Sequence, residues 1–296
     1  RVLIAGNGPL NIQLAAELSQ AGVDVVALVE AAAFLSPRRA LAGARMGWNA
    51  PGLTRDGVGY LAALAARRVP LLPSSVVASL EGDPHRGVER ATVARLNPDG
   101  SASTRRRTFD VDAVCLGYGF LPSNDLARSL GARHEYDERR GALSTVTDET
   151  GRTSIPTVWA VGDTAGVRGA KFAQTQGALA AAAILADLGR GGAAPSAALA
   201  RQARRHLSFQ RGVNALFEAP VLTDQLAESD TIVCRCEGVV HGDLVEAMTE
   251  GVSAPGSVKR VTRAGMGKCQ GRYCGPVLTQ MQARLSGEPA SERSGF

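Results

Sequence analysis

The sequence predicts an α/β protein: a parallel sheet of the Rossmann type, followed by a small helical module near the C-terminus. Three observations lead to this prediction. A buried strand, a glycine-rich turn and a helix succeed one another at the start of the chain. A second strand-like segment, TSIPTVWAVGD, runs into a long alanine-rich helix. Four of the five cysteines fall between Cys234 and Cys274, far from the first two features.

Size and composition exclude several classes of protein. The 296 residues leave room for two or three domains with a sizeable core. No apolar run reaches the ~18–20 residues of a membrane span, and no secretory signal is present. The net charge of +5 comes mostly from dispersed arginines, and no nucleic-acid-binding motif accompanies them, so we expect no nucleic-acid partner. Clustered cysteines, unlike a disulfide framework, indicate a reducing compartment, the cytoplasm.

The N-terminal part is expected to begin with a β-α-β unit over residues 2–30. VLIAG is a continuous apolar run, typical of a parallel strand that is buried on both faces. The helix after it should stop at Gly22, and VDVVALVE should form the next strand. The arginine-, glycine- and proline-rich residues 36–56 are expected to be a loop. A helix over 57–68 and a strand within 69–83 should follow.

The remaining elements are expected from alternation, glycines and composition. Residues 88–107 alternate around the turn signal NPDG, which predicts an antiparallel hairpin. The other expected elements are a strand over 109–119, a strand over 153–166, a helix near 170–188, a linker over 189–196, a helix over 196–217 and a disordered tail, GEPASERSGF.

The first nucleotide signal is AGNGPLN, between a strand and a helix. Gly6 would permit a tight turn, and Gly8 would let the backbone approach a pyrophosphate at the helix N-terminus. Glu30 ends the next strand, where an acidic residue accepts a hydrogen bond from a ribose hydroxyl. An acid there favours NAD or another adenine nucleotide, such as ATP, over NADP. Asn11 replaces the usual glycine or alanine and should loosen the helix packing. The alternative is a Rossmann unit kept only for structure.

The second signal is the pair Gly162-Asp163. An aspartate at the end of a strand can accept hydrogen bonds from a ribityl or ribose hydroxyl, while the next helix N-terminus faces phosphate or flavin. The alternative is an aspartate that only caps a helix.

These segments resemble the two-dinucleotide-binding flavoproteins. TSIPTVWAVGD resembles their second FAD signature, and VDAVCLGYGFLPS resembles the strand and turn that return from their NAD domain. The resemblance implies an NAD-like domain over 1–107 and the C-terminal part of a split FAD domain over 108–190. The family's first FAD loop would precede residue 1. The chain starts inside a strand, without Met, so we expect a piece of a longer protein that binds FAD poorly by itself.

The four clustered cysteines are Cys234, Cys236, Cys269 and Cys274, spaced C-x-C-x32-C-x4-C. A 2Fe–2S cluster takes four thiolates, two on each iron, and each sequence pair is expected to hold one iron. Nearby basic residues would balance the negative cluster: Arg235, Lys259, Arg260, Arg263, Lys268 and Arg272. A structural zinc site and a redox-active dithiol are the alternatives, although C-x-C is poor zinc spacing. The fifth cysteine, Cys115, is expected to be a small buried residue.

Residues 229–286 resemble the bacterioferritin-associated-ferredoxin-like 2Fe–2S domain, through CRCE and RAGMGKCQGRYCGP. A helical linker over 191–228 would precede this module, and 287–296 would be its tail. A flavoprotein with this ending resembles the alpha subunits of opine oxidase, hydrogen cyanide synthase, and proline or D-hydroxyproline dehydrogenase complexes.

The resemblance implies an electron-transfer subunit with FAD and a 2Fe–2S cluster, which serves an FAD-dependent beta subunit that oxidises an amine or amino acid. No side chain stands out as a general acid or base, so the chemistry belongs to the cofactors. Two other readings are open. One is a stand-alone NADH-dependent flavin reductase that feeds its own cluster, and the other is a nucleotide-binding, zinc-stapled scaffold.

Overall fold

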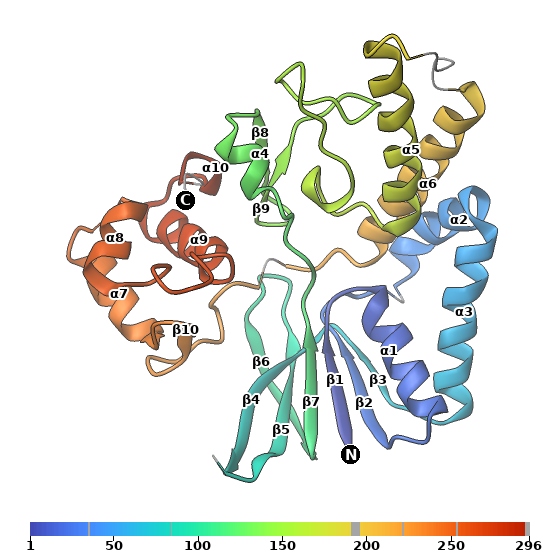
Figure 1. Ribbon diagram of the computed structural model, residues 1–296. Coiled ribbons are helices and arrows are strands. Elements are labelled where there is room, and N and C mark those ends of the chain that lie inside the picture. The colour runs from blue at the N-terminus through green and yellow to red at the C-terminus, as the bar shows by residue number, and fades with distance from the viewer. Residues whose placement is uncertain (35, 84, 191–195, 221, 253, 294–296) are drawn as a thin grey trace.

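The computed structural model describes residues 1–34, 36–83, 85–190, 196–220, 222–252 and 254–293. Its first half is built on a parallel sheet with the strand order β3-β2-β1-β7 (Figure 1). These strands are β1 (Val2–Gly6), β2 (Val25–Glu30), β3 (Leu71–Pro73) and β7 (Ala113–Gly117). The strand order and the parallel pairing confirm the predicted Rossmann-like sheet.

The two faces of the sheet are covered differently. Helices α1 (Pro9–Gln20) and α3 (Pro51–Ala66) lie on one face (Figure 1). An antiparallel sheet of β4 (Ser75–Asp83), β5 (Gly87–Leu96) and β6 (Ala102–Asp110) covers the other face. Successive side chains of β1 therefore enter different cores: Ile4 packs with the helices, and Leu3 packs with β5. The predicted hairpin and the predicted helix stop are both present, with Gly22 in the left-handed region at φ 88°.

Residues 36–56, expected to be a loop, instead contain α2 (Ala40–Asn49) and the first turns of α3. That expectation was wrong because tertiary packing outweighs the glycines in this segment. Met46 of α2 packs into the helical-side core, and Gly212 of the later helix α6 approaches it closely. A Cβ on Gly212 would lie 2.6 Å from Met46 Cγ.

The middle of the chain holds a short helix, a hairpin and two long helices. These are α4 (Asp125–Ser129), β8 (His134–Asp137), β9 (Ala142–Thr145), α5 (Ala170–Asp187) and α6 (Ala197–Leu216). The long helices are as predicted, and α6 packs against both α2 and α5. Residues 191–195 of the expected linker lie outside the described residues.

Residues 153–166 do not form the expected strand. This segment has one isolated bridge, between Arg152 and Trp159, and a single 3-10 turn, η2 (Gly162–Thr164). Its backbone bonds are local: Ala160 N–H donates to the carbonyl of Gly151, 2.8 Å away. A strand needs a hydrogen-bonded neighbour, and none of the described strands runs beside this segment. The strand expected over 109–119 is likewise divided, since Asp110 ends β6 before β7 begins.

The C-terminal module consists of β10 (Ile232–Cys234), β11 (Val239–Val240), α7 (His241–Thr249), α8 (Pro255–Thr262) and α9 (Cys274–Ser286). It has a core of its own, which includes the fully buried Leu244, Val258 and Leu278. A further helix, α10 (Ala290–Arg293), occupies part of the expected tail and buries Ala290. Among the described helices, none is long and apolar enough to cross a bilayer.

Side-chain contacts at several places attach this module to the rest of the chain. Asp224, whose side chain is 4 % exposed, accepts hydrogen bonds from His241 at the start of α7 and from Arg284 in α9. Arg272 pairs with Asp125 of α4 at 3.0 Å. Gln280 of α9 donates to the hydroxyl of Tyr136 in β8. The module is thereby tied both to the segment that leads into it and to α4 and β8.

Candidate cofactor sites

The four clustered cysteines lie together as two neighbouring thiol pairs, and all are free of disulfides. Cys236 is in hydrogen-bonding contact with Cys269, and Cys234 is in contact with Cys274. The charge of Cys269 also acts on Cys274, which shows that the two pairs are adjacent. Each of these two contacts joins the first loop to the second. That sequence neighbours share one iron stays a prediction.

The two cysteine-bearing loops direct backbone N–H groups at the sulfurs and come very close to each other at Gly267. Gly265 N–H points at Cys234 Sγ, 3.5 Å away. Backbone N–H groups of residues 271–273 lie around the Cys269 sulfur, and α9 begins at Cys274. A Cβ on Gly267 would lie 2.3 Å from Cys236 Cβ, far inside contact distance. Only glycine at 267 lets the two loops meet this closely.

The environments of the two pairs differ. Contact with Cys236 lowers the pKa of Cys269, helped by the backbone N–H groups around it. Burial, together with the charge of Cys234, raises the pKa of Cys274 to about 12. The Cys236–Cys269 pair is thus the more accessible one, while Cys234 and Cys274 form the buried side.

This donor set fits a binuclear cluster. A 2Fe–2S cluster takes two thiolates on each iron, which matches two adjacent thiol pairs. Across the described parts of the chain, no group of three or more His, Cys, Asp or Glu side chains is placed to hold one metal ion. A tetrahedral zinc site needs four donors around a single point, so the paired arrangement favours the cluster over zinc.

Two of the six expected basic residues are engaged in ion pairs near the thiols. Arg263 contacts Glu237 at 2.8 Å, and Arg272 contacts Asp125. Arg235 and Lys268 are exposed beside the ligand loops and have no ion-pair partner in the ranges that the structure describes. Their positive charges are therefore available to balance the negative charge of a bound cluster.

The glycine-rich turn is closely packed at its two ends. A Cβ on Gly6 would lie 1.9 Å from the carbonyl oxygen of Gly117, so the turn requires glycine there. Asn11 was expected to loosen the packing of α1 on the sheet. Instead its amide donates to that same carbonyl at 2.8 Å and is nearly buried. Gly8, at φ 118°, has open space where a Cβ would be.

Glu30 is fully buried and its carboxylate is bonded to protein groups. It accepts hydrogen bonds from Gly8 N–H at 3.0 Å, Ala32 N–H at 2.8 Å and the Asn7 amide at 2.9 Å. Burial raises the pKa of Glu30, although these donors and Arg39 oppose the rise. A ribose hydroxyl would have to displace one of these partners to reach the carboxylate.

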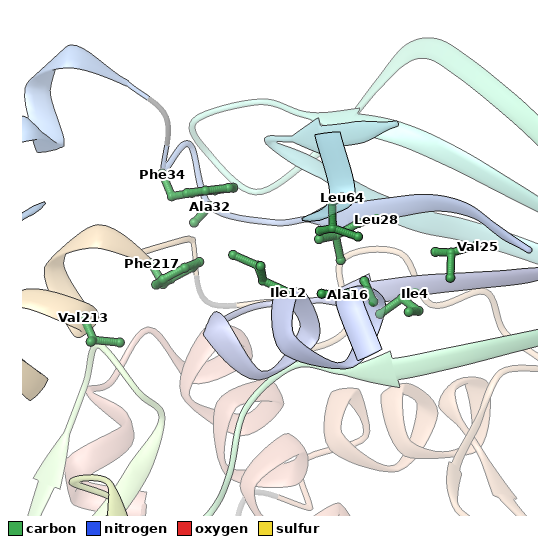
Figure 2. Close-up of a cluster of buried hydrophobic side chains, with 11 residues drawn as sticks. Ile4, Ile12, Ala16, Val25, Leu28, Ala32, Phe34, Leu64, Val213 and Phe217 are labelled. Carbon is green, nitrogen blue, oxygen red and sulfur yellow. The ribbon is translucent and has the colours of Figure 1, made fainter. Parts of the chain in front are cut away.

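A distant part of the chain contacts the glycine-rich turn. Phe217, just beyond α6, stacks on Phe34 with ring centroids 5.2 Å apart and joins the core of Ile12 and Ala32 (Figure 2). Its carbonyl accepts from the Asn7 amide at 3.0 Å. Phe217 was missed from the sequence because it lies more than 200 positions from the turn. Phe34, the aromatic residue on which it stacks, gave no signal of this contact in the sequence either.

The second nucleotide signal lies on an exposed turn. Gly162, at φ 62°, donates its N–H to the buried Gln176 at 3.1 Å. The carbonyl of Asp163 accepts from Ser123 N–H at 3.2 Å. The carboxylate of Asp163 is exposed and has no hydrogen-bond or ion-pair partner among the described residues. It is therefore free to accept hydrogen bonds from a bound hydroxyl group.

Comparison with known families decides the class of the chain. A model described as pyridine nucleotide-disulphide oxidoreductase matches residues 1–184. The chain belongs to this family. A second model, the BFD-like 2Fe–2S binding domain, matches residues 232–283, which contain all four clustered cysteines. The matches confirm the resemblance drawn from the motifs. They imply a pyridine nucleotide-disulphide oxidoreductase with FAD, NAD(P) and a 2Fe–2S cluster as cofactors.

Relatives of this oxidoreductase include subunits of larger enzymes. Hydrogen cyanide synthase subunit HcnB of Pseudomonas aeruginosa is 35 % identical over 294 residues, which cover 96 % of this chain and 61 % of the relative. An opine oxidase subunit from Agrobacterium tumefaciens is 31 % identical, covering 95 % and 54 %. The chain thus spans less than two thirds of these relatives.

A solved structure confirms the fold. The crystal structure of L-proline dehydrogenase from P. horikoshii superposes with a TM-score of 0.54 and 21 % identity, covering 80 % of this chain and 44 % of that one.

Proposed function

We propose that the chain is the electron-transfer part of a flavin-dependent amine or amino-acid dehydrogenase, of the opine, proline or hydroxyproline type. Its partner would be an FAD-dependent beta subunit that oxidises the substrate. The observation that supports this most directly is the meeting of four free thiols, as two adjacent pairs, beside an oxidoreductase domain. The names of the relatives supply the substrate class.

Cys234, Cys236, Cys269 and Cys274 would hold the cluster, which when bound accepts and releases one electron at a time. Gly265 N–H and the N–H groups of 271–273 would donate to the sulfurs and stabilise their negative charge. The apolar core under α9 keeps water from the buried pair. The exposed Cys236 marks the side from which an electron partner can approach.

Asp163 would bind a flavin hydroxyl, and a short covalent and hydrogen-bonded path leads from it to the cluster loop. Ser123 N–H donates to the Asp163 carbonyl, and two residues later Asp125 pairs with Arg272. Arg272 lies between two of the cysteine ligands. We therefore place the exchange of electrons between flavin and cluster along this side of the molecule.

The glycine-rich turn remains our candidate for an adenine nucleotide, NAD or ATP. A pyrophosphate would lie over Gly8, where space is open, at the N-terminus of α1. Asn11 and Gly6 shape the turn, and Glu30 becomes available to a ribose only when the Phe217 segment moves away.

The test begins with metal analysis of anaerobically reconstituted protein. We expect about two irons and two acid-labile sulfides per chain. Replacing any one of the four clustered cysteines by Ala should abolish the visible cluster spectrum. Cys115→Ala is the matched control and should retain it, since Cys115 lies on β7 in the parallel sheet. Protein that binds zinc and no iron would support a scaffold instead.

The partner is tested by co-expression with a candidate beta subunit, followed by a screen of amine substrates. We expect an amine to reduce the flavin and the cluster only in the complex. Rapid reduction of the flavin by NADH in the absence of a partner would support a stand-alone reductase and contradict the proposed role.

A further inference from the structure

We propose that a cationic groove between α3, α5 and α6 binds a phosphate-bearing ligand with two linked phosphoryl groups. The groove has a volume of about 670 Å³ and is lined from all three helices, by residues that include Leu53, Lys171 and Arg205. A second hollow of about 430 Å³ adjoins it and shares Lys171 and His206. These volumes suit a small molecule.

The charge of the groove is one-sided. Lys171, Arg201 and Arg205 line it, and no aspartate or glutamate does. None of these three cations has an ion-pair partner within the described ranges, whereas Arg152 pairs with Asp187 near the far end of α5. Arg201 and Arg205 are four positions apart on α6 and so share a face, where like charges repel. A bound anion would be attracted to both side chains, and this attraction would offset the repulsion between them.

His206 adds a directed polar group. The Thr175 hydroxyl donates its single hydrogen to the Lys171 carbonyl at 2.8 Å, so it accepts from His206 Nδ1, 3.0 Å away. The proton of the neutral ring is therefore on Nδ1, and Nε2 is left for a ligand. A protonated phosphoryl oxygen can donate to Nε2, or Nε2–H can donate to phosphate once the ring is charged.

The start of α3 completes the lining. Asn49, Ala50, Gly52 and Leu53 border the groove, and Ala50 offers no side-chain cap to the helix. First-turn N–H groups lack partners inside their own helix, and the helix dipole favours anions at this end. Together with the three cations, this gives donors from α3, α5 and α6 around one groove, and a diphosphate has enough acceptor oxygens to engage several of them at once.

The groove is separate from both nucleotide signals. Neither the glycine-rich turn at Gly6 and Gly8 nor the pair Gly162-Asp163 contributes to its lining. The proposal is therefore independent of the cluster and of the proposed electron transfer, and can fail or succeed without them.

The experiment is a calorimetric titration of the 296-residue chain with inorganic pyrophosphate at low salt. We expect one saturable site. The double variant Arg201→Gln/Arg205→Gln should weaken binding by at least tenfold, because each charge-assisted hydrogen bond contributes substantially to affinity. Arg204→Gln is the control: it removes one positive charge from α6, where the double variant removes two, at a position outside the groove, and should change affinity less than twofold.

A second titration, with ADP, distinguishes a nucleotide from a free diphosphate. Tighter binding of ADP than of pyrophosphate, lost in the double variant, would identify a nucleotide ligand. Equal binding of both would identify the diphosphate alone as the recognised group. No saturable binding of pyrophosphate, or an equal loss in Arg204→Gln and in the double variant, would overturn the proposal.

Discussion

Gly267 determines whether the two cysteine loops can meet. Its missing side chain leaves room for Cys236, whose Cβ would lie 2.3 Å from any Cβ added at 267. Because the backbone carbon of Cys236 is close as well, the methyl group of an alanine at 267 would push the two loops apart.

We predict that Gly267→Ala reduces iron and sulfide content severalfold while the rest of the chain stays folded. Iron analysis and circular dichroism measure the two effects. Gly256→Ala, in α8, is the control: Gly256 has ordinary helical geometry and no close neighbour, so it should keep its cluster and gain about 0.5–1 kcal/mol of stability. Equal cluster content in the two variants would contradict this account of the loop.

Glu30 was expected from the sequence to bind a ribose, and the structure gives it internal partners instead. The motif identified the strand end correctly, because the position of Glu30 follows from the local β-α-β pattern. Its full set of partners could not be predicted, because the Asn7 amide that donates to it also donates to the carbonyl of Phe217, from a distant part of the chain. Asn11 is similar: its position was evident, but its bond to Gly117 depends on how β1 and β7 pair.

The raised pKa of Glu30 predicts a pH dependence of stability. Because burial raises this pKa above its ordinary 4.5, folding favours the protonated form. That stabilisation is complete below about pH 4.5 and is lost as pH rises through the raised pKa. The free energy of unfolding of the natural chain should therefore fall, relative to that of Glu30→Gln, as pH rises above 4.5. Denaturant titrations across this range measure it, and parallel curves would show that Glu30 does not carry the effect.

At the scale of elements, the residue just beyond α6 binds the glycine-rich turn, since the carbonyl of Phe217 accepts a hydrogen bond from Asn7. Long helices such as α5 and α6 were predicted well, since alanine-rich and periodic segments carry their own signal. The segment 36–56 was mispredicted because its helices depend on packing against α6. The segment 153–166 was mispredicted because a strand needs a neighbour and its own residues cannot provide one.

We predict that Phe217→Ala increases the affinity for ADP at the glycine-rich turn, because without the stack on Phe34 the carbonyl of residue 217 no longer holds the Asn7 amide in place beside Glu30. The substitution should also cost about 3–5 kcal/mol of stability. Phe172→Ala is the control, since Phe172 is equally buried, in the core between α5 and α6. It should cost a similar amount and leave ADP binding unchanged. A gain of affinity in both variants, measured by calorimetry, would attribute the effect to general loosening.

At the scale of the whole molecule, the buried carboxylate of Asp224 contributes more to holding the cluster module than the exposed ion pair of Arg272 and Asp125 does. Asp224 is 4 % exposed and holds both His241 and Arg284, whereas the side chains of Arg272 and Asp125 are 68 % and 50 % exposed. Surface pairs contribute about 0.2–1 kcal/mol, whereas a hydrogen bond to a charged group contributes about 1.5–3 kcal/mol.

We therefore predict that Asp224→Ala lowers the free energy of unfolding by about 1.5–3 kcal/mol, and that Asp125→Ala lowers it by less than about 1 kcal/mol. Denaturation followed by circular dichroism measures both changes. A larger effect of Asp125→Ala than of Asp224→Ala would reverse this ranking.

The anchoring through Asp224 has a kinetic consequence. A redox centre on a swinging arm delivers electrons at a rate limited by how often the arm reaches its target, and that rate falls in viscous solvent. A centre clamped at a constant tunnelling distance delivers them at a rate independent of viscosity. With Asp224, Arg272 and Gln280 all holding the module, we expect the clamped behaviour. Transfer within the molecule should then follow a single exponential and be unchanged by added sucrose.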